Sequence, residues 1–204
     1  MLIARVQGQL YAVGAFCSVS GRPLIDGLLF GDKIMSPHLA ASYSVITGAP
    51  ESAPALDGIP SYKVSLINGK YFVSVPEGKL VKKVSPTLAK RDPEDKRNYV
   101  IVGGGPAGLM CAETLRLSGY TGKITILNDK KALPYDKTLL SKDLDAEALP
   151  LRSKEFLRDA NIDLVKNGLY AIHPEKKSLV LLRGRPMDYD KLVIACGGEP
   201  VKPQ

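Results

Sequence analysis

The 204-residue sequence lacks tryptophan and contains only three cysteines and two histidines. The cysteines are odd in number and far apart, which argues against a disulfide framework, so we expect a reducing intracellular compartment, cytoplasmic or mitochondrial. No apolar run has the length of a membrane helix, and the first residues lack the basic and apolar regions of a secretion signal. We therefore expect neither a secreted scaffold nor a membrane span.

The sequence also lacks a concentrated charge of one sign. Its net charge is +7, and charged residues make up 24% of the chain. The excess is diffuse and has no interleaved aromatic residues, so we expect no nucleic-acid partner. With 45% hydrophobic residues, the composition is that of a globular protein rather than a disordered or fibrous one.

The first part of the chain, residues 1–78, predicts a small all-β domain. Glycine, proline and asparagine separate short apolar stretches, and Asn68-Gly69 predicts a hairpin with a type I′ turn. The expected strands are Leu2–Val6, Gln9–Val13, Lys33–Met35, Tyr62–Ile67 and Lys70–Val75. Residues 79–97 are rich in charge and proline and predict a linker.

Residues 98–204 predict an incomplete Rossmann-like domain of the α/β class. A strand at 99–102 precedes a glycine turn, a helix over 107–118 that ends at Gly119, and a second strand at 124–127. A short helix is expected after Ser153. Further strands are expected at 162–165, 170–173, 178–182 and 192–195.

A glycine fingerprint of the form G-x-G-x-x-G lies between the first strand and the helix. In this motif the first glycine allows a tight turn, the second lets a pyrophosphate approach the backbone, and the third lets helix and strand pack closely. Asp129 follows the third glycine by 21 positions, where a ribose hydroxyl needs an acceptor. The alternative is a corner whose glycines serve packing alone. We predict as cofactor-binding residues Gly103, Gly105, Pro106, Ala107, Gly108 and Asp129.

Residues 133–142, LPYDKTLLSK, resemble the LPYxRPPLSK stretch of the flavoprotein reductases that include apoptosis-inducing factor and the ferredoxin reductases of dioxygenase systems. The resemblance implies that the fingerprint holds FAD, that Lys137 contacts the flavin nucleotide and that Lys142 lies beside the isoalloxazine ring. Lys137 replaces the family's arginine and so lacks its planar fork. The alternative for Lys142 is a solvated surface lysine.

Residues 192–200, LVIACGGEP, resemble the LIATGG-P segment that closes against the flavin in the same family. This resemblance adds Ala195 and Gly197 to the predicted cofactor-binding residues. Cys196 stands in place of threonine, and we expect a small buried side chain rather than a redox thiol. We expect Cys111 to belong to the core and His173 to be structural.

Residues 14–48 resemble a Rieske domain, which implies a 2Fe-2S cluster held by two cysteines and two histidines. The four ligand positions carry Cys17, Val19, Ser36 and Leu39, and His38 is one residue out of register. Only the first of these is a matching ligand. We therefore predict a degenerate Rieske-like domain with no cluster and no other metal.

The arrangement resembles the Rieske-bearing branch of the apoptosis-inducing factor family. It implies a FAD-dependent NAD(P)H oxidoreductase with an electron-transfer or family-domain partner. We expect FAD to bind weakly and this chain alone to be inactive, because the family's NAD(P)H site is not in these residues and both ends look truncated; an isoform, a partial gene model or a decayed copy would each explain this. The alternative is a non-catalytic module that binds a nucleotide or a protein. No catalytic residue is assigned.

Overall fold

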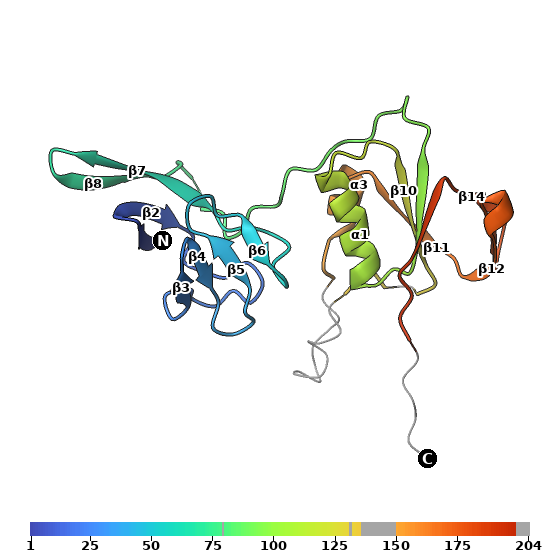
Figure 1. Cartoon of the computed structure of the whole chain (residues 1–204), viewed down its shortest axis with the longest axis horizontal. Coiled ribbons are helices and arrows are strands. Elements are labelled where there is room, and N and C mark those ends of the chain that lie inside the picture. Colours follow the sequence, from blue (N-terminus) through green and yellow to red (C-terminus); the bar gives the residue numbers. More distant parts are fainter. Residues whose placement is uncertain (79, 131, 136–149, 199–204) are drawn as a thin grey trace, which may run out of the picture. The chain divides into compact units, whose positions relative to one another are not determined.

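The computed structural model describes residues 1–78, 80–130, 132–135 and 150–198 (Figure 1). The chain divides into two compact units, Met1–Pro86 and Thr87–Gln204, called unit 1 and unit 2 below. None of the helices in the described ranges combines the length and the hydrophobicity that crossing a membrane requires.

Unit 1 is built of two antiparallel sheets. The first has the strand order β1-β2-β7-β8, with β1 at Leu2–Val6, β2 at Gln9–Val13, β7 at Ser61–Ile67 and β8 at Lys70–Ser74. The second has the order β3-β4-β5-β6, with β3 at Leu28–Phe30, β4 at Lys33–Met35, β5 at Ser42–Ser44 and β6 at Pro50–Ser52. Val13, Leu24, Tyr43 and Val45 are fully buried in its core.

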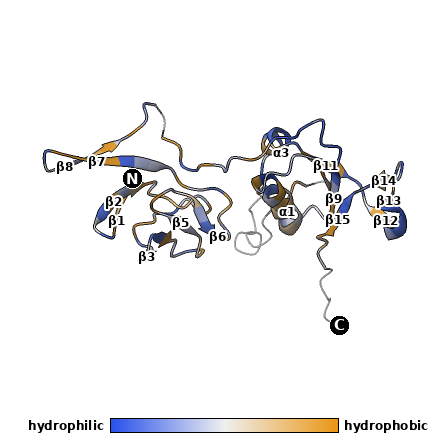
Figure 2. Ribbon diagram, turned by 45° about the horizontal axis from the view of Figure 1, so that its top comes forward, coloured by the Kyte–Doolittle hydropathy of each residue, from blue (hydrophilic) through white to orange (hydrophobic). Residues whose placement is uncertain are grey.

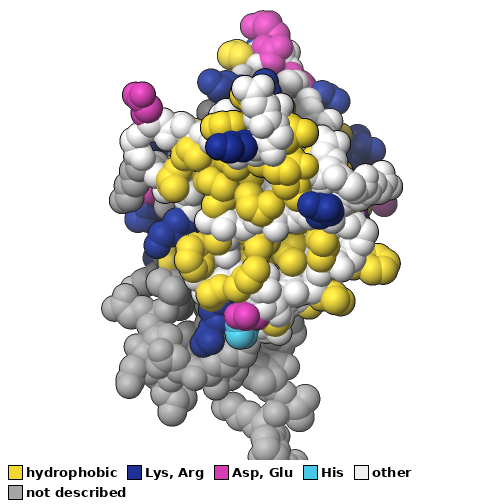
Figure 3. All heavy atoms as spheres, turned by 90° about the vertical axis from the view of Figure 1, so that its left-hand side faces the viewer, with side chains coloured by type: hydrophobic (Ala, Val, Ile, Leu, Met, Phe, Trp, Pro, Cys, Tyr) yellow, Lys and Arg dark blue, Asp and Glu magenta, His cyan; other side chains and the backbone are white. Residues whose placement is uncertain are grey.

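The predicted hairpin is confirmed. Asn68 and Gly69 have φ angles of 50° and 73°, as a type I′ turn requires, and β7 pairs with β8 in the register Ile67↔Lys70. Figure 2 shows hydrophobic residues in both strands. Figure 3 views the side toward which the hairpin projects in Figure 1. Hydrophobic side chains cover much of that face. Four side chains of the hairpin are more than half exposed: Leu66, Ile67, Tyr71 and Phe72.

Unit 2 contains a four-stranded parallel sheet of order β11-β10-β9-β15. Its elements are β9 (Asn98–Val102), α1 (Pro106–Leu117), β10 (Lys123–Asn128), α3 (Lys154–Asp159), β11 (Ile162–Lys166) and β15 (Lys191–Ile194). An antiparallel sheet of order β12-β13-β14 joins β11 to β15 in the chain: β12 is Leu169–His173, β13 is Ser178–Leu181 and β14 is Met187–Asp188, with a 3₁₀ turn at Pro174–Lys176.

Alternate residues of the parallel strands enter two cores. Ile101 and Ile126 lie in the core that contains Leu109 of α1 and Leu157 of α3. On the other face, Val100, Val102 and Leu127 pack with Leu179 of β13. Both faces of the central strands are therefore buried, as is usual for a parallel sheet.

The helix α1 begins and ends as expected. Pro106 occupies its first turn, where the missing N–H costs no hydrogen bond, and Gly119 beyond its end has a φ of 83°. The second half of the predicted linker makes ordered contacts with unit 2: Leu88 packs against its core, and the Asp92 amide donates to the Thr121 carbonyl at 2.9 Å. The backbone of this half is therefore held against unit 2 although the segment is highly charged.

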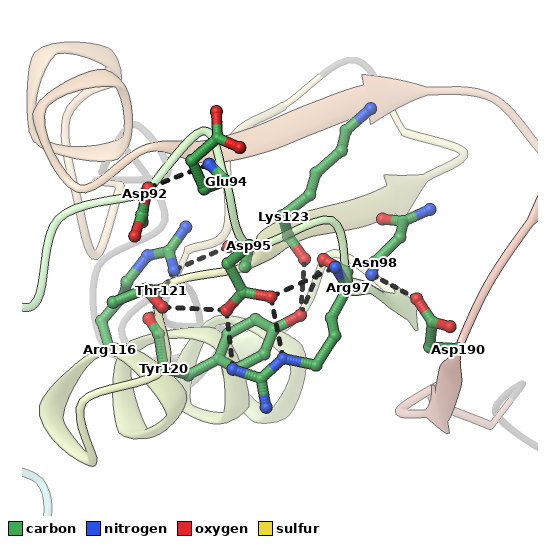
Figure 4. Close-up of polar contacts among 11 residues, drawn as sticks. Asp92, Glu94, Asp95, Arg97, Asn98, Arg116, Tyr120, Thr121, Lys123 and Asp190 are labelled. Atoms are coloured by element: carbon green, nitrogen blue, oxygen red, sulfur yellow. Dashed lines mark hydrogen bonds and ion pairs between the residues drawn. The ribbon is translucent and has the colours of Figure 1, made fainter.

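Beside the amino ends of β9 and β10, a charged network fixes the end of this segment (Figure 4). The Arg97 guanidinium donates from Nε to Asp95 Oδ1 at 2.8 Å and from an Nη to Oδ2 at 2.6 Å, and Thr121 Oγ1 donates to Oδ2 at 2.8 Å. These hydrogen bonds hold the pKa of the Asp95 carboxyl well below its usual range. Nearby, burial raises the pKa of Tyr120 to about 12, and its hydroxyl donates to the Arg97 carbonyl at 3.0 Å.

Asp95 is expected to make unit 2 acid-sensitive. Its pKa is lower in the folded chain than in the unfolded one, so its contribution to stability is present above the ordinary value of 3.8 and is lost as the pH falls below that value. The melting temperature of the wild type should therefore fall more steeply from about pH 4 to about pH 2 than that of Asp95→Asn. Parallel melting curves of the two proteins across this range would contradict the assignment.

Candidate functional site

The glycine loop lies at the carboxyl edge of the parallel sheet, between β9 and α1. Gly103 has a φ of 120°, a conformation that side chains rarely adopt, and a Cβ there would collide with the Ala195 carbonyl. A Cβ at Gly108 would collide with the carbonyl oxygen of Gly103. These two glycines are therefore required by the close packing of the loop, the helix and β15.

Gly105 differs from both. Its φ of −93° and ψ of −174° are extended backbone that any residue adopts, and a Cβ there would meet no atom of the described residues within 4 Å. It is the N-cap of α1, and in the part of the chain that the structure describes no side chain caps the helix; its first turn contains no acidic residue. The free amides of Ala107 and Gly108 and the helix dipole make this end attractive to an anion. The open space in front of Gly105 is large enough for the backbone to be approached closely.

Asp129 leaves the same edge of the sheet as the glycine loop. It directly follows β10, whose residue Leu127 pairs with Val102 of β9 in parallel register. Because parallel strands bring their carboxyl ends to one edge, the exposed Asp129 and Gly103 follow neighbouring strand ends. A carboxylate and a helix N-terminus so placed suit the ribose and the pyrophosphate of one dinucleotide.

The third part of the site comes from β15. The Ala195 amide donates to the Val102 carbonyl at 2.7 Å, which places Ala195 beside the glycine loop. Within residues 1–78, 80–130, 132–135 and 150–198, a Cβ at Gly197 would meet nothing within 4 Å. The prediction of a buried Cys196 is wrong: the residue is exposed, with Sγ 3.6 Å from the Val102 carbonyl oxygen. It follows the end of β15, which is an edge strand, so fewer neighbours cover it.

Two predicted residues, Lys137 and Lys142, lie outside the described residues. The other two side chains considered at the sequence level are placed: Cys111 is partly buried against the core of α1 and the sheet, where burial raises its thiol pKa, and His173 ends β12. A contact between Gly104 and Asn128 was missed. The only sequence signal for this contact is that Gly104, at the first variable position of the G-x-G-x-x-G motif, is also a glycine.

In unit 1, the four ligand positions that the Rieske resemblance predicts divide by burial. Cys17 and Ser36, at the two cysteine positions, are each 2% exposed. At the two histidine positions, Val19 is exposed and Leu39 is partly buried. His38 is exposed. The fold thus keeps the cysteine positions inside and the histidine positions nearer the surface.

Hydrogen bonds surround Cys17, which matches one of the predicted ligands. Cys17 Sγ lies 3.2 Å from the Tyr43 hydroxyl, and the Ser20 amide donates to Sγ at 3.5 Å. Burial raises the pKa of the Cys17 thiol, but hydrogen bonds from Ser20 and Tyr43 lower it by more, so the net pKa is below its ordinary value. Burial also raises the pKa of Tyr43 to about 12.

Ser36 is the least satisfied of the four positions. Its buried hydroxyl has no hydrogen-bond partner among the residues that the structure describes. A hollow of about 450 Å³ is lined by the loop of Cys17 and by Lys82 and Lys83. Among the described residues, no group of three or more His, Cys, Asp or Glu side chains is placed to hold a metal ion.

Comparison with known proteins gives matches to both units. The family model of pyridine nucleotide-disulphide oxidoreductases matches residues 97–204. Apoptosis-inducing factor 3 of Mus musculus is 32% identical over 212 residues, which cover 98% of this chain and 34% of that protein. The chain therefore spans about a third of the length of this relative.

Two further matches each cover about half of the chain. Putidaredoxin reductase CamA of Pseudomonas putida is 38% identical over 109 residues, or 50% of this chain and 26% of that protein. The crystal structure of the covalent putidaredoxin reductase-putidaredoxin complex matches with a TM-score of 0.48 and 37% identity, over 52% of this chain and 27% of that one.

Proposed function

Because the chain belongs to the pyridine nucleotide-disulphide oxidoreductase family, we propose that unit 2 binds FAD and serves a FAD-dependent oxidoreductase of the ferredoxin reductase and apoptosis-inducing factor type. One observation carries the proposal. The backbone of Gly105 is open at the uncapped N-terminus of α1, and a side chain at this position would fill the space that a pyrophosphate needs. When bound, the flavin would supply hydride and single-electron chemistry.

Each part of the loop has a proposed role in holding the cofactor. Gly103 makes the turn, and Pro106 begins the helix with a preset φ and no N–H. The amides of Ala107 and Gly108 donate toward the pyrophosphate, and the Asp129 carboxylate accepts from the adenosine ribose. These residues bind and orient the cofactor; none of them moves a proton.

The remaining assignments extend the site toward the flavin. Ala195 and Gly197 are proposed to close against the flavin, since Ala195 lies beside the glycine loop at the end of β15 and Gly197 follows it by two residues. Lys137 and Lys142 are proposed as flavin contacts on their resemblance to the family motif alone. The acceptor is proposed to be a separate electron-transfer protein, in keeping with the similarity to putidaredoxin reductase CamA.

The visible spectrum of the purified chain tests this proposal against a non-catalytic module. Bound flavin gives the protein its own visible absorption, and added FAD should lose fluorescence on binding. A colourless protein that leaves the fluorescence of added FAD unchanged would support the alternative, a module that binds a partner protein.

For unit 1, we propose a degenerate Rieske-like domain that holds no 2Fe-2S cluster. The donor set does not fit a cluster: Val19 and Leu39 offer no lone pair, and the Ser36 hydroxyl is a poor iron ligand. What supports the Rieske-like fold is the resemblance of residues 14–48 together with the burial of both cysteine positions.

Restoring the ligands should restore the cluster. The triple variant Val19→His, Ser36→Cys, Leu39→His, with native Cys17, should take up two irons and two sulfides on chemical reconstitution, since a Rieske cluster needs two of each ligand. The control Ser36→Cys alone should take up no stoichiometric iron, and neither should the wild type. A triple variant with the circular dichroism of a folded β domain but without a cluster would contradict the Rieske alignment.

A further inference from the structure

Asn128 ends β10 and is only 5% exposed, whereas the next residue, Asp129, is exposed. The Asn128 side chain forms hydrogen bonds on both of its polar atoms. Oδ1 accepts from the Lys130 amide at 3.3 Å, and Nδ2 donates to the Ala132 carbonyl at 2.9 Å. The Asn128 carbonyl also accepts from the Asn167 amide at 3.1 Å. The amide side chain thus fixes, from the inside, the backbone that carries Asp129.

The same side chain packs on the glycine loop. A Cβ at Gly104 would lie 2.5 Å from Asn128 Cβ and 2.6 Å from its Oδ1. Such distances are far shorter than van der Waals contact, and φ at Gly104 is not in the left-handed region. The absence of a side chain at Gly104 is therefore explained by Asn128 rather than by backbone strain.

We propose that Asn128 is a positioning residue for the dinucleotide, an inference that rests on the proposed function. Asn128 contacts the glycine loop, which faces the pyrophosphate, and it orders the backbone that carries Asp129, which faces the ribose. It therefore sets the distance between the two positions that hold the same rigid half of the dinucleotide. A site in which two groups must contact the ligand at the same time binds it more weakly when one group is displaced by as little as about 1 Å.

The structural part of the proposal predicts that the effect of a substitution at Gly104 on the melting temperature depends on the residue at position 128. Gly104→Ala should lower the melting temperature in the wild-type chain, because the new methyl group meets Asn128. In an Asn128→Gly background the same substitution should have little effect, since the Asn128 Cβ and amide group that the methyl group would meet are both gone. Equal losses in both backgrounds would contradict the contact.

The functional part is tested by titrating the full chain with ADP and with 2′-deoxy-ADP. Asn128→Ala should weaken ADP binding about tenfold, the size of one lost hydrogen bond to a charged group. It should also reduce the preference for ADP over 2′-deoxy-ADP toward that of Asp129→Ala, which a merely structural loss would leave unchanged. If Asn128→Ala does not fold, Asn128→Ser, which keeps an acceptor for the Lys130 amide, provides the measurement.

The outcomes separate the two levels of the argument. Wild-type chain that binds neither nucleotide would overturn the proposed function itself. Wild-type binding with an unchanged ADP preference in every folded Asn128 variant would overturn only the positioning role.

Discussion

Arg152→Ala is expected to destabilise unit 2 by about 3–5 kcal/mol, because it would leave a buried carboxylate without its charged partner. Arg152 donates from Nε and an Nη to the two oxygens of Glu113 on α1, both at 2.9 Å. The side chains of Arg152 and Glu113 are 3% and 2% exposed, so water does not solvate either charge. The guanidinium also lies 4.2 Å from the centre of the Phe156 ring.

Urea denaturation followed by circular dichroism measures the effect. A matched control is Arg158→Ala, which removes an ion pair with Asp159 whose side chains are 75% and 69% exposed. This control should change the unfolding free energy by no more than about 1 kcal/mol. Equal losses for the two variants would show that the Glu113 carboxylate does not depend on Arg152.

The second large effect is expected at the glycine loop, where two similar substitutions should act differently. Gly105→Val should reduce FAD affinity by about a hundredfold or more while the fold is retained, because its side chain enters open space where the pyrophosphate approaches. Gly108→Ala should destabilise unit 2, since its methyl group meets the Gly103 carbonyl. FAD fluorescence quenching and thermal melting of each variant separate binding from stability.

The control for both variants is Thr114→Val, an exposed position on α1 remote from the N-terminal turn. It should change neither quantity. Unchanged FAD binding by folded Gly105→Val would mean that the nucleotide lies elsewhere.

The strand, glycine turn, helix and second strand of unit 2 could be predicted because their signals are local. The fingerprint, the apolar runs and Gly119 act within a few residues of the structure they form. The strands β3, β5 and β6 could not be predicted. The sequences Ser42–Ser44 and Pro50–Ser52 have low strand propensity, and they become strands by pairing with each other and with β4.

The site divides in the same way. Gly103, Gly105 and Asp129 follow from spacing, whereas the contact of Gly104 with Asn128 depends on how tightly two strand ends approach. The Glu113–Arg152 ion pair joins residues 39 positions apart. From the sequence alone, a carboxylate on a helix is expected to be exposed to solvent, because its buried partner is not identifiable.

An ADP titration of the isotope-labelled full chain, followed by backbone amide chemical shifts, tests the central claim most directly. If unit 2 holds the dinucleotide as proposed, saturable shifts should concentrate at the amides of residues 103–108 and at Asp129, and Gly105→Val should abolish them. Saturable shifts confined to unit 1, or none at all at high ADP concentration, would contradict a nucleotide site at the glycine loop.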